Sequence, residues 1–142
     1  MCGIVGHVAC QASQRSRQVV LDGLSRLEYR GYDSAGIALA SPGKLNVIKA
    51  VGKLVNLREA VDQDAPADAF AGIGHTRWAT HGRPTVANAH PHVSPDGRFA
   101  LVHNGIIENA DNLRAQLRAQ GAIFTSETDT EVVVHLLAHA YD

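Results

Sequence analysis

The first half of the chain divides into blocks whose apolar spacing predicts three strands and two helices. Small and β-branched residues fill positions 3–10 (GIVGHVAC) and predict a buried strand. Apolar side chains recur on one helical face over residues 16–27. Residues 34–41 and 45–51 predict two strands, which the intervening Pro, Gly and Lys join as a hairpin. A short helix is expected over residues 54–62.

The second half predicts two more strands and a helix around a long loop. Residues 70–77 (FAGIGHTR) are an apolar run that ends in polar side chains, and they predict a strand. The loop over residues 79–95 contains three of the five prolines, and a loop of this length in a compact domain is usually functional. A strand over residues 99–104 (FALVHN) precedes a helix over residues 111–120.

A last helix is expected after Thr128 and Glu131, whose spacing is that of a capping box. The resulting order is strand, helix, two strands, helix, two strands and two helices. This order favours a layered α+β fold over a helical bundle or a β-sandwich. It leaves the pairing of the strands open.

Length and composition narrow the class of protein. The 142 residues suit one domain with one sizeable core, and 45% hydrophobic with 19% charged residues is typical of a folded chain. With 13 basic and 14 acidic residues the formal charge is −1, so we expect neither a nucleic acid nor an anionic membrane as partner. No signal-peptide pattern and no apolar run near the roughly 18 residues of a membrane span is present. A cytoplasmic protein is expected.

The two cysteines, Cys2 and Cys10, support the same location. If both lie in one strand, their Cα atoms are about 26 Å apart, because a strand rises roughly 3.3 Å per residue. A disulfide needs about 7 Å or less. We therefore expect two reduced thiols, as in a reducing compartment, with Cys10 a small buried hydrophobe.

Cys2 carries the strongest chemical signal, because it follows the initiator Met1 in MCGIVG. Residue two is small enough for a peptidase to remove Met1, which would leave a thiol and a free α-amine on one residue. An α-amine has an unperturbed pKa of about 7.7 to 8.0 and a thiol one of about 8.5. Near neutral pH the amine can therefore take or relay the thiol proton, as in N-terminal nucleophile enzymes.

Four further segments concentrate polar residues where a strand or helix begins or ends: residues 30–36 (RGYDSAG), 74–82 (GHTRWATHG), 103–109 (HNGIIEN) and 126–131 (SETDTE). Each alone has a structural explanation, since Gly, Asn, Asp and Thr suit irregular backbone. Together with Cys2 and NAHPH, and in this order and spacing, they resemble the glutaminase domain of class II glutamine amidotransferases. The likeness is greatest to the hexosamine-forming branch.

The resemblance implies a four-layer αββα N-terminal nucleophile hydrolase fold, incomplete here at its C-terminal end. Residues 1–142 would be a partial glutaminase domain that lacks the sugar-isomerase domains. The implied activity is hydrolysis of L-glutamine to glutamate and ammonia, and the ammonia would convert fructose 6-phosphate to glucosamine 6-phosphate in the full-length enzyme. That enzyme is expected to be a homo-oligomer and to need no cofactor.

The resemblance also implies roles for three catalytic residues. Cys2 resembles the nucleophile, and its attack on the carboxamide creates a tetrahedral oxyanion. Asn104 and Gly105 resemble the pair that donates to this oxyanion, one through a side-chain amide and one through a backbone N–H. Such a donor contributes about 2.7 to 4 kcal/mol in comparable sites. Locally, an Asn-Gly turn closing a hairpin explains the pair equally well.

Substrate-binding roles follow in the same way. Arg77 and Asp129 resemble the groups that bind the α-carboxylate and α-ammonium of glutamine, and the planar guanidinium suits a carboxylate. Without the resemblance, Arg77 would be read as a surface ion-pair partner and Asp129 as a helix cap. Thr80 and His81 resemble further contacts. Trp78 resembles the residue that covers glutamine and gates the ammonia path, although core packing is an equal alternative.

Three alternatives stay open at this point. Four of the eight histidines, His75, His81, His90 and His92, invite a metal site, but their spacing only loosely resembles that of zinc ligands, and we expect no metal. Another class II enzyme, of the amidophosphoribosyltransferase or asparagine synthetase type, is the closest rival, and Tyr32 argues against it. A non-catalytic module that retains the glutamine pocket is the third.

Overall fold

The computed structural model describes residues 1–79 and 82–141, so Thr80 and His81, two of the expected glutamine contacts, lie outside the described residues. The larger of its two sheets is antiparallel, with strand order β1-β4-β2-β3. Its strands are β1 (Gly3–Ser13), β2 (Ser34–Ser41), β3 (Lys44–Val51) and β4 (Ala69–Arg77). The smaller sheet pairs β5 (His92–Val93) with β6 (Ala100–Leu101).

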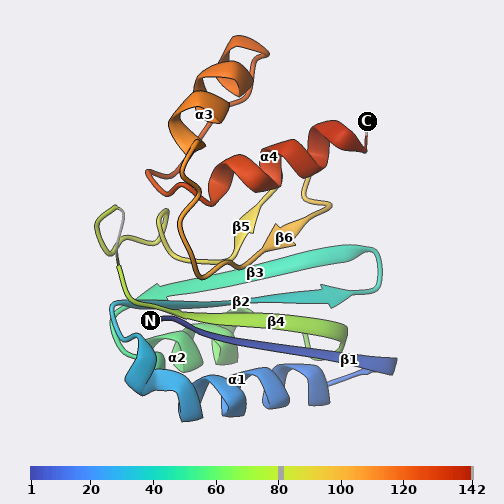
Figure 1. The fold of residues 1–142 in the computed structure, drawn as a ribbon. Coiled ribbons are helices and arrows are strands. Elements are labelled where there is room, and N and C mark those ends of the chain that lie inside the picture. Colours follow the sequence, from blue (N-terminus) through green and yellow to red (C-terminus); the bar gives the residue numbers. More distant parts are fainter. Residues whose placement is uncertain (80–81, 142) are drawn as a thin grey trace.

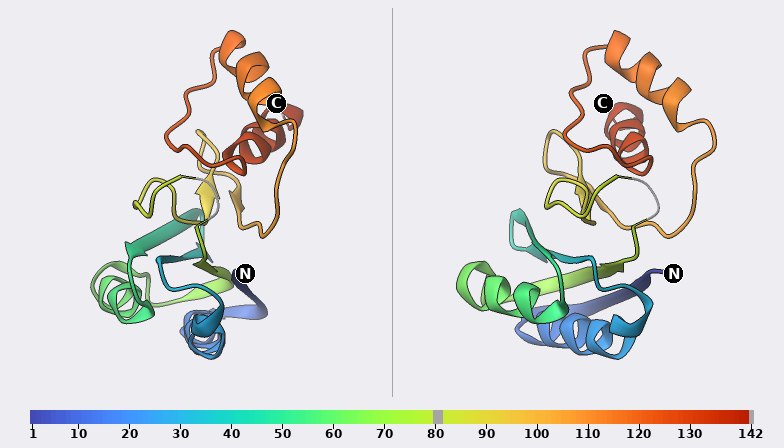
Figure 2. Two further views of the ribbon diagram at one scale, coloured as in Figure 1. Left: turned by 60° about the vertical axis from the view of Figure 1, so that its left-hand side comes forward. Right: turned by 90° about the vertical axis from the view of Figure 1, so that its left-hand side faces the viewer.

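The helices lie on both outer sides of these sheets. They are α1 (Arg15–Leu27), the 3-10 helix η1 (Glu28–Arg30), α2 (Leu54–Asp64), α3 (Ala110–Ala119) and α4 (Glu131–Ala140). Helices α1 and α2 cover one face of the larger sheet, and the β5-β6 pair, followed by α4 and α3, lies beyond its other face (Figures 1 and 2). The layers therefore follow the expected α, β, β, α order, with only two residues in each strand of the second sheet.

The main core forms because alternate residues of β2 point to opposite faces of the sheet. Ile37 and Leu39 are fully buried toward the helices, where Leu24 of α1 and Leu57 of α2 meet them. Gly36 and Ala38 have the opposite parity and face the second layer. A separate apolar cluster joins α3 to α4; its buried members are Ala110, Leu117 and Val132.

Strand β1 is less buried than its composition predicts. It is an edge strand, and its residues alternate between half-buried and exposed positions, with Ile4 and Val8 exposed. Cys10 is exposed, so the expectation of a buried residue there is wrong. Side chains with the parity of Ile4 point away from α1, and no described segment covers them. Cys2 and Cys10 are both free, as expected.

Two other local expectations are wrong. The strand expected over residues 99–104 is limited to Ala100–Leu101, and its partner β5 lies inside the segment expected to be a loop. Thr128 is not the N-cap of α4; Thr130 is, and it makes no side-chain capping bond. The hydroxyl of Thr128 instead contacts His92 Nε2 at 2.8 Å. The Thr128 hydroxyl, which a capping box would use, is therefore engaged in a tertiary contact.

Of the described helices, none has both the length and the apolar character needed to cross a membrane. The second layer lies close to the first because the segment before β5 passes over β2 at a glycine, Gly36. A Cβ atom built on Gly36 would lie 2.0 Å from the carbonyl oxygen of His90. This approach brings the segment before β5 directly onto the sheet.

Replacing Gly36 with alanine should therefore destabilise the fold, because the new methyl group meets backbone rather than a flexible side chain. We expect the free energy of unfolding to fall by about 2 kcal/mol or more. The matched control is Gly6→Ala in β1, where a Cβ would meet nothing within 4 Å, and its effect should stay within about 0.5 kcal/mol. Equal effects in urea denaturation would contradict this account of the layer contact.

Candidate active site

A cavity of about 260 Å³ opens where the N-terminus, the end of β4, the segment after β6 and the segment before α4 converge. Six of the eight residues expected in the site line it: Cys2, Arg77, Trp78, Asn104, Gly105 and Asp129. The lining also includes Met1, His90, His103, Ile106, Thr128 and Thr130. The structure therefore gathers, in one cavity, side chains from segments more than 100 residues apart in the sequence.

Pairing between β1 and β4 places Cys2. Gly3 is in register with Thr76, and its N–H donates to the Thr76 hydroxyl at 3.1 Å. Cys2 is thus held beside the end of β4, next to the N-terminus marked in Figure 1. Its Sγ accepts the N–H of Trp78 at 3.4 Å and lies 3.9 Å from the Trp78 carbonyl oxygen. The half-buried thiol is fixed by backbone and faces the cavity.

Asn104 and Gly105 lie in the exposed segment between β6 and α3. Because the next element along the chain is a helix, the pair does not close a hairpin, and that local explanation is wrong. The preceding residue, His103, is held by its neighbours. Its N–H donates to His90 Nδ1 at 3.3 Å, and its carbonyl oxygen lies 3.2 Å from His75 Nε2.

Arg77 is the last residue of β4 and is 4% exposed, so it is not a surface ion-pair partner. Its guanidinium donates to the carbonyl oxygens of Gly82 at 3.1 Å and Arg83 at 3.3 Å. The side chain thereby ties the chain beyond residue 81 to β4 while it lines the cavity.

Asp129 joins the cavity to the segment that leads into α3. Its Oδ2 accepts the N–H of Ile107 at 2.7 Å, and its Oδ1 lies 3.3 Å from the hydroxyl of Thr130. Because its side chain reaches across to residue 107 and the N-cap is Thr130, Asp129 does not cap α4. A carboxylate therefore sits in the same cavity as the Arg77 guanidinium.

Trp78 is 47% exposed and stands at the cavity rim, which excludes the core-packing alternative. The ring of Tyr32 meets it edge-on, with centroids 5.6 Å apart. Asp33 supports the same stretch, because its Oδ2 accepts the N–H of Ala79 and its Oδ1 accepts the hydroxyl of Ser34 at 2.9 Å. Tyr32 and Asp33, within the segment 30–36 to which the sequence assigned no individual roles, therefore contact Trp78 and Ala79.

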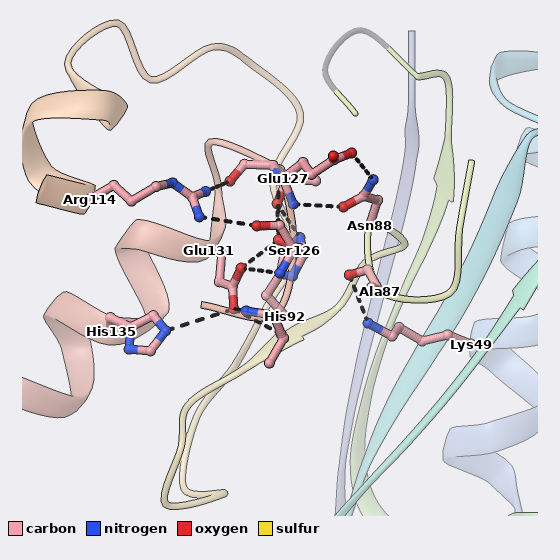
Figure 3. A network of polar contacts seen from close by, with 11 residues as sticks. Lys49, Ala87, Asn88, His92, Arg114, Ser126, Glu127, Glu131 and His135 are labelled. Atoms are coloured by element: carbon pink, nitrogen blue, oxygen red, sulfur yellow. Dashed lines mark hydrogen bonds and ion pairs between the residues drawn. The ribbon is translucent and has the colours of Figure 1, made fainter. Parts of the chain in front are cut away.

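A buried carboxylate organises the segment before α4. Glu131 is 3% exposed and accepts the N–H and hydroxyl of both Thr125 and Ser126 at 2.6 to 2.9 Å. Burial raises the pKa of Glu131, but these hydrogen bonds outweigh it, and the net pKa lies below its usual value. Arg114 of α3 donates to the Ser126 carbonyl at 3.0 Å (Figure 3). The segment that presents Asp129 is therefore anchored on both sides.

Asn88 connects this segment to the loop beyond residue 81. Its side chain is almost fully buried, accepts the N–H of Glu127 at 2.8 Å and donates to the Arg83 carbonyl at 3.0 Å. Lys49 of β3 donates to the Ala89 carbonyl at 3.0 Å, and burial lowers the pKa of its ammonium, partly offset by the charge of Glu131. Sequence reasoning quoted Asn88 within NAHPH but gave it no role. It assigned Glu131 only to a capping box and did not single out Lys49.

Three buried histidines stack behind the cavity. The rings of His75 and His90 are 4.3 Å apart and nearly parallel, and His92 meets His90 edge-on at 4.6 Å. Burial lowers the pKa of His75 and of His92 to about 4, and it lowers that of His90 further. All three are therefore neutral near pH 7. Within residues 1–79 and 82–141, no group of three or more His, Cys, Asp or Glu is arranged to hold a metal ion.

Comparison with known families agrees with this arrangement. A family model for the glutamine amidotransferase domain matches residues 41–140. The chain belongs to the glutamine amidotransferase family. Relatives named glutamine-fructose-6-phosphate aminotransferase [isomerizing] share 56% identity in Symbiobacterium thermophilum and 58% in Thermus thermophilus. They cover 100% and 99% of the chain, which spans about 23% of the length of each relative.

Solved structures support the fold of this amidotransferase domain. The allosteric regulatory enzyme of purine biosynthesis matches with a TM-score of 0.81 and 32% identity, over 96% of this chain and 29% of that one. Glutamine phosphoribosylpyrophosphate amidotransferase from B. subtilis matches with a TM-score of 0.70 and 33% identity, over 96% of this chain and 28% of that one. The expected N-terminal nucleophile fold is confirmed.

The buried imidazoles should make the stability of the amidotransferase domain pH-dependent. His75 and His92 have folded-state pKa values of about 4 against 6.5 for an ordinary histidine. The unfolded chain therefore binds more protons below about pH 6.5, and the free energy of unfolding should fall between pH 6.5 and 4. Each of these two rings can contribute about 3 kcal/mol, and their loss should be complete near pH 4, whereas His90, whose pKa is lower still, continues the decline below pH 4.

Urea denaturation at a series of pH values measures this slope. The variant His92→Gln should show a shallower decline, because one of the buried groups that titrates only in the unfolded chain is gone. The exposed His139→Gln should decline as the unmodified protein does. A free energy of unfolding that stays constant from pH 7 to 5 would show that the buried rings are already charged or solvated.

Proposed function

We propose that this chain hydrolyses L-glutamine to glutamate and ammonia, with Cys2 as an N-terminal nucleophile. One observation carries the proposal: a single cavity contains the thiol, an Asn-Gly pair and two buried or half-buried groups of opposite charge. A free amino acid with a carboxamide side chain needs each of these, because its two α-substituents are charged and its reacting group passes through an oxyanion. The volume of about 260 Å³ suits a ligand smaller than most drugs.

The mechanism begins with removal of Met1, which itself lines the cavity, so the freed α-amine of Cys2 stays in the site. The amine takes the thiol proton, and the thiolate sulfur forms a bond to the carboxamide carbon. The side-chain N–H of Asn104 and the backbone N–H of Gly105 then donate to the oxyanion. The α-ammonium returns its proton to the departing nitrogen, and ammonia leaves as the carbonyl re-forms.

A thioester between Cys2 and the glutamyl group remains. Water, deprotonated by the same α-amine, attacks its carbonyl carbon, and the bond to sulfur breaks to give glutamate. Asn104 and Gly105 donate again to the second oxyanion. The chemistry uses only groups of this chain and water, so no cofactor is required.

Substrate binding in this proposal rests on charge complementarity. The Arg77 guanidinium binds the α-carboxylate and Asp129 binds the α-ammonium, so that the side-chain amide of glutamine extends toward Cys2. Both charged groups are oriented before substrate binds, Arg77 by backbone carbonyls and Asp129 by the Ile107 N–H. Trp78 covers the bound glutamine and gates the path by which ammonia leaves. By family resemblance, Thr80 and His81 add contacts.

For the complete protein we propose the reaction named for its relatives: the ammonia converts fructose 6-phosphate to glucosamine 6-phosphate. Residues 1–142 would then be part of a glutaminase domain, and sugar-isomerase domains elsewhere would bind the sugar phosphate. A homo-oligomeric enzyme and a cytoplasmic location stay predictions. The rival acceptor, a phosphoribosyl group, is less well supported, because the chain is 56 to 58% identical to the two aminotransferases and 32 to 33% identical to the two solved structures.

The central prediction concerns Cys2. Cys2→Ala should abolish glutamate release, because no other group in the cavity can form the thioester. A diazo-ketone analogue of glutamine should label Cys2 of the full-length protein and leave Cys10 unlabelled. Mass spectrometry of the labelled peptide also shows whether Met1 is gone. Retention of Met1 in fully active protein would contradict the α-amine mechanism, and binding of glutamine without any glutamate release would favour a non-catalytic module.

A second prediction isolates the oxyanion donor. Asn104→Ala should lower kcat for glutamate release by about 100- to 1,000-fold, because one donor to the transition state is lost. KM should change little. Asn109→Ala is the matched control, since Asn109 is exposed, lies outside the cavity and makes no side-chain capping bond to α3. A similar loss in both variants, in steady-state assays, would count against the assigned role.

A further inference from the structure

The proposed mechanism makes no use of the buried histidine stack, although its members come from three separate parts of the chain. His75 lies within β4, His90 and His92 lie at the start of the second layer, and the stack touches His103 before the Asn-Gly pair. Burying three polar rings side by side removes their hydrogen bonds to water, which costs free energy. A role in orienting polar groups would explain why imidazoles, rather than apolar side chains, occupy these positions.

Two of the rings bind both backbone polar groups of His103. Because a carbonyl oxygen only accepts, His75 must carry its proton on Nε2, which lies 3.2 Å from the His103 oxygen. Because an N–H only donates, His90 must accept with an unprotonated Nδ1, which lies 3.3 Å from the His103 nitrogen. The two rings therefore need opposite roles at the positions that face His103. His90 must be neutral with an unprotonated Nδ1, and His75 must keep a proton on Nε2, as a neutral ring does in only one of its two tautomers.

The surroundings preserve this state. His75 is fully buried, and its Nδ1 has no hydrogen-bond partner among the described residues. A proton there would create a buried, unpaired charge directly over the His90 ring, with the Arg77 guanidinium also near. The backbone of His90 is in turn pressed onto the sheet at Gly36. Both rings thus have little freedom to move away from His103.

The His103 carbonyl belongs to the peptide bond that leads into Asn104. Fixing this peptide plane and the preceding N–H sets the direction in which the chain delivers the Asn104 side chain and the Gly105 N–H. The two donors are themselves exposed, so the support comes from behind them. A misplacement of about 1 Å in such a site can cost roughly 100-fold in rate.

We propose that His75 and His90 are positioning residues for the oxyanion-binding pair Asn104 and Gly105, gripping His103 from both sides as a neutral donor and a neutral acceptor. This inference rests on the proposed glutamine hydrolysis. It assigns the histidines no contact with substrate and no proton transfer. Their effect is on the stabilisation of the oxyanion, so it is felt in kcat more than in the binding of glutamine.

The test compares His75→Leu with His75→Gln in the full-length protein. The side chain of His75→Leu fills the space but has no hydrogen-bond donor. The side-chain amide of His75→Gln can place an N–H near the position of Nε2. His75→Leu should lower kcat for glutamate release by about 10- to 100-fold with KM changed by less than about two-fold, because Arg77 and Asp129 bind the α-substituents. His75→Gln should recover most of the loss. The exposed His139→Leu serves as the control.

A second measurement separates positioning from loss of structure. Alkylation of Cys2 by iodoacetamide forms no oxyanion, so its rate, followed on the Cys2 peptide by mass spectrometry, should be the same in His75→Leu and in the unmodified protein. Slower alkylation, an equal change in kcat and KM, a kcat of His75→Gln as low as that of His75→Leu, or an unchanged kcat in His75→Leu would each overturn the inference.

A third measurement does not depend on activity. Hydrogen exchange at the backbone amides of residues 103–105 should be faster in His75→Leu than in the unmodified protein, while the central residues of β2 keep their protection. If the unmodified protein released no glutamate, the proposed function would fail, and the exchange result would still decide the inference. Unchanged exchange at residues 103–105 would overturn it.

Discussion

The antiparallel pairing of β1 with β4 is the constraint on which the site depends. The register that sets Gly3 against Thr76 brings the first residues of the chain beside the end of β4. Cys2 and Arg77, which we propose as the nucleophile and the carboxylate-binding group, and Trp78 at the rim are thereby placed by one set of backbone hydrogen bonds. A shift of one residue would turn the Cys2 side chain to the opposite face of the sheet, because side chains alternate along a strand.

The second layer completes the site with polar contacts more than with apolar ones. Its sheet has only two residues in each strand, and the apolar cluster between α3 and α4 lies away from the cavity. Buried or partly buried hydrogen bonds from Glu131, Asn88 and Lys49 hold the loops around the cavity in place. Such bonds are directional, so they orient short irregular segments that packing alone would leave free to shift.

Local sequence pattern was a good guide to the larger elements and a poor one to the second layer. The hairpin of residues 34–51 and the helices α1 and α2 were predicted almost to the residue, because apolar periodicity and turn residues encode them directly. The β5-β6 pair, the exposure of Cys10 and the cap of α4 were not. A two-residue bridge has no period, exposure at an edge depends on strand order, and the threonine of an apparent capping box can bind elsewhere.

For the site, the sequence by itself determined which chemical groups are available: a thiol that can become N-terminal, an Asn-Gly pair, a guanidinium and a carboxylate, in an order that resembles one family. Only the tertiary structure decided that these five residues share a cavity with Trp78. It also decided that His75, His90, Asn88 and Glu131 hold the loops around that cavity. The physical reason is range. Composition and spacing indicate contacts between residues that are close in the sequence. The pairing of β1 with β4 and the buried polar network join segments that are far apart in the sequence, and no periodic pattern marks such contacts.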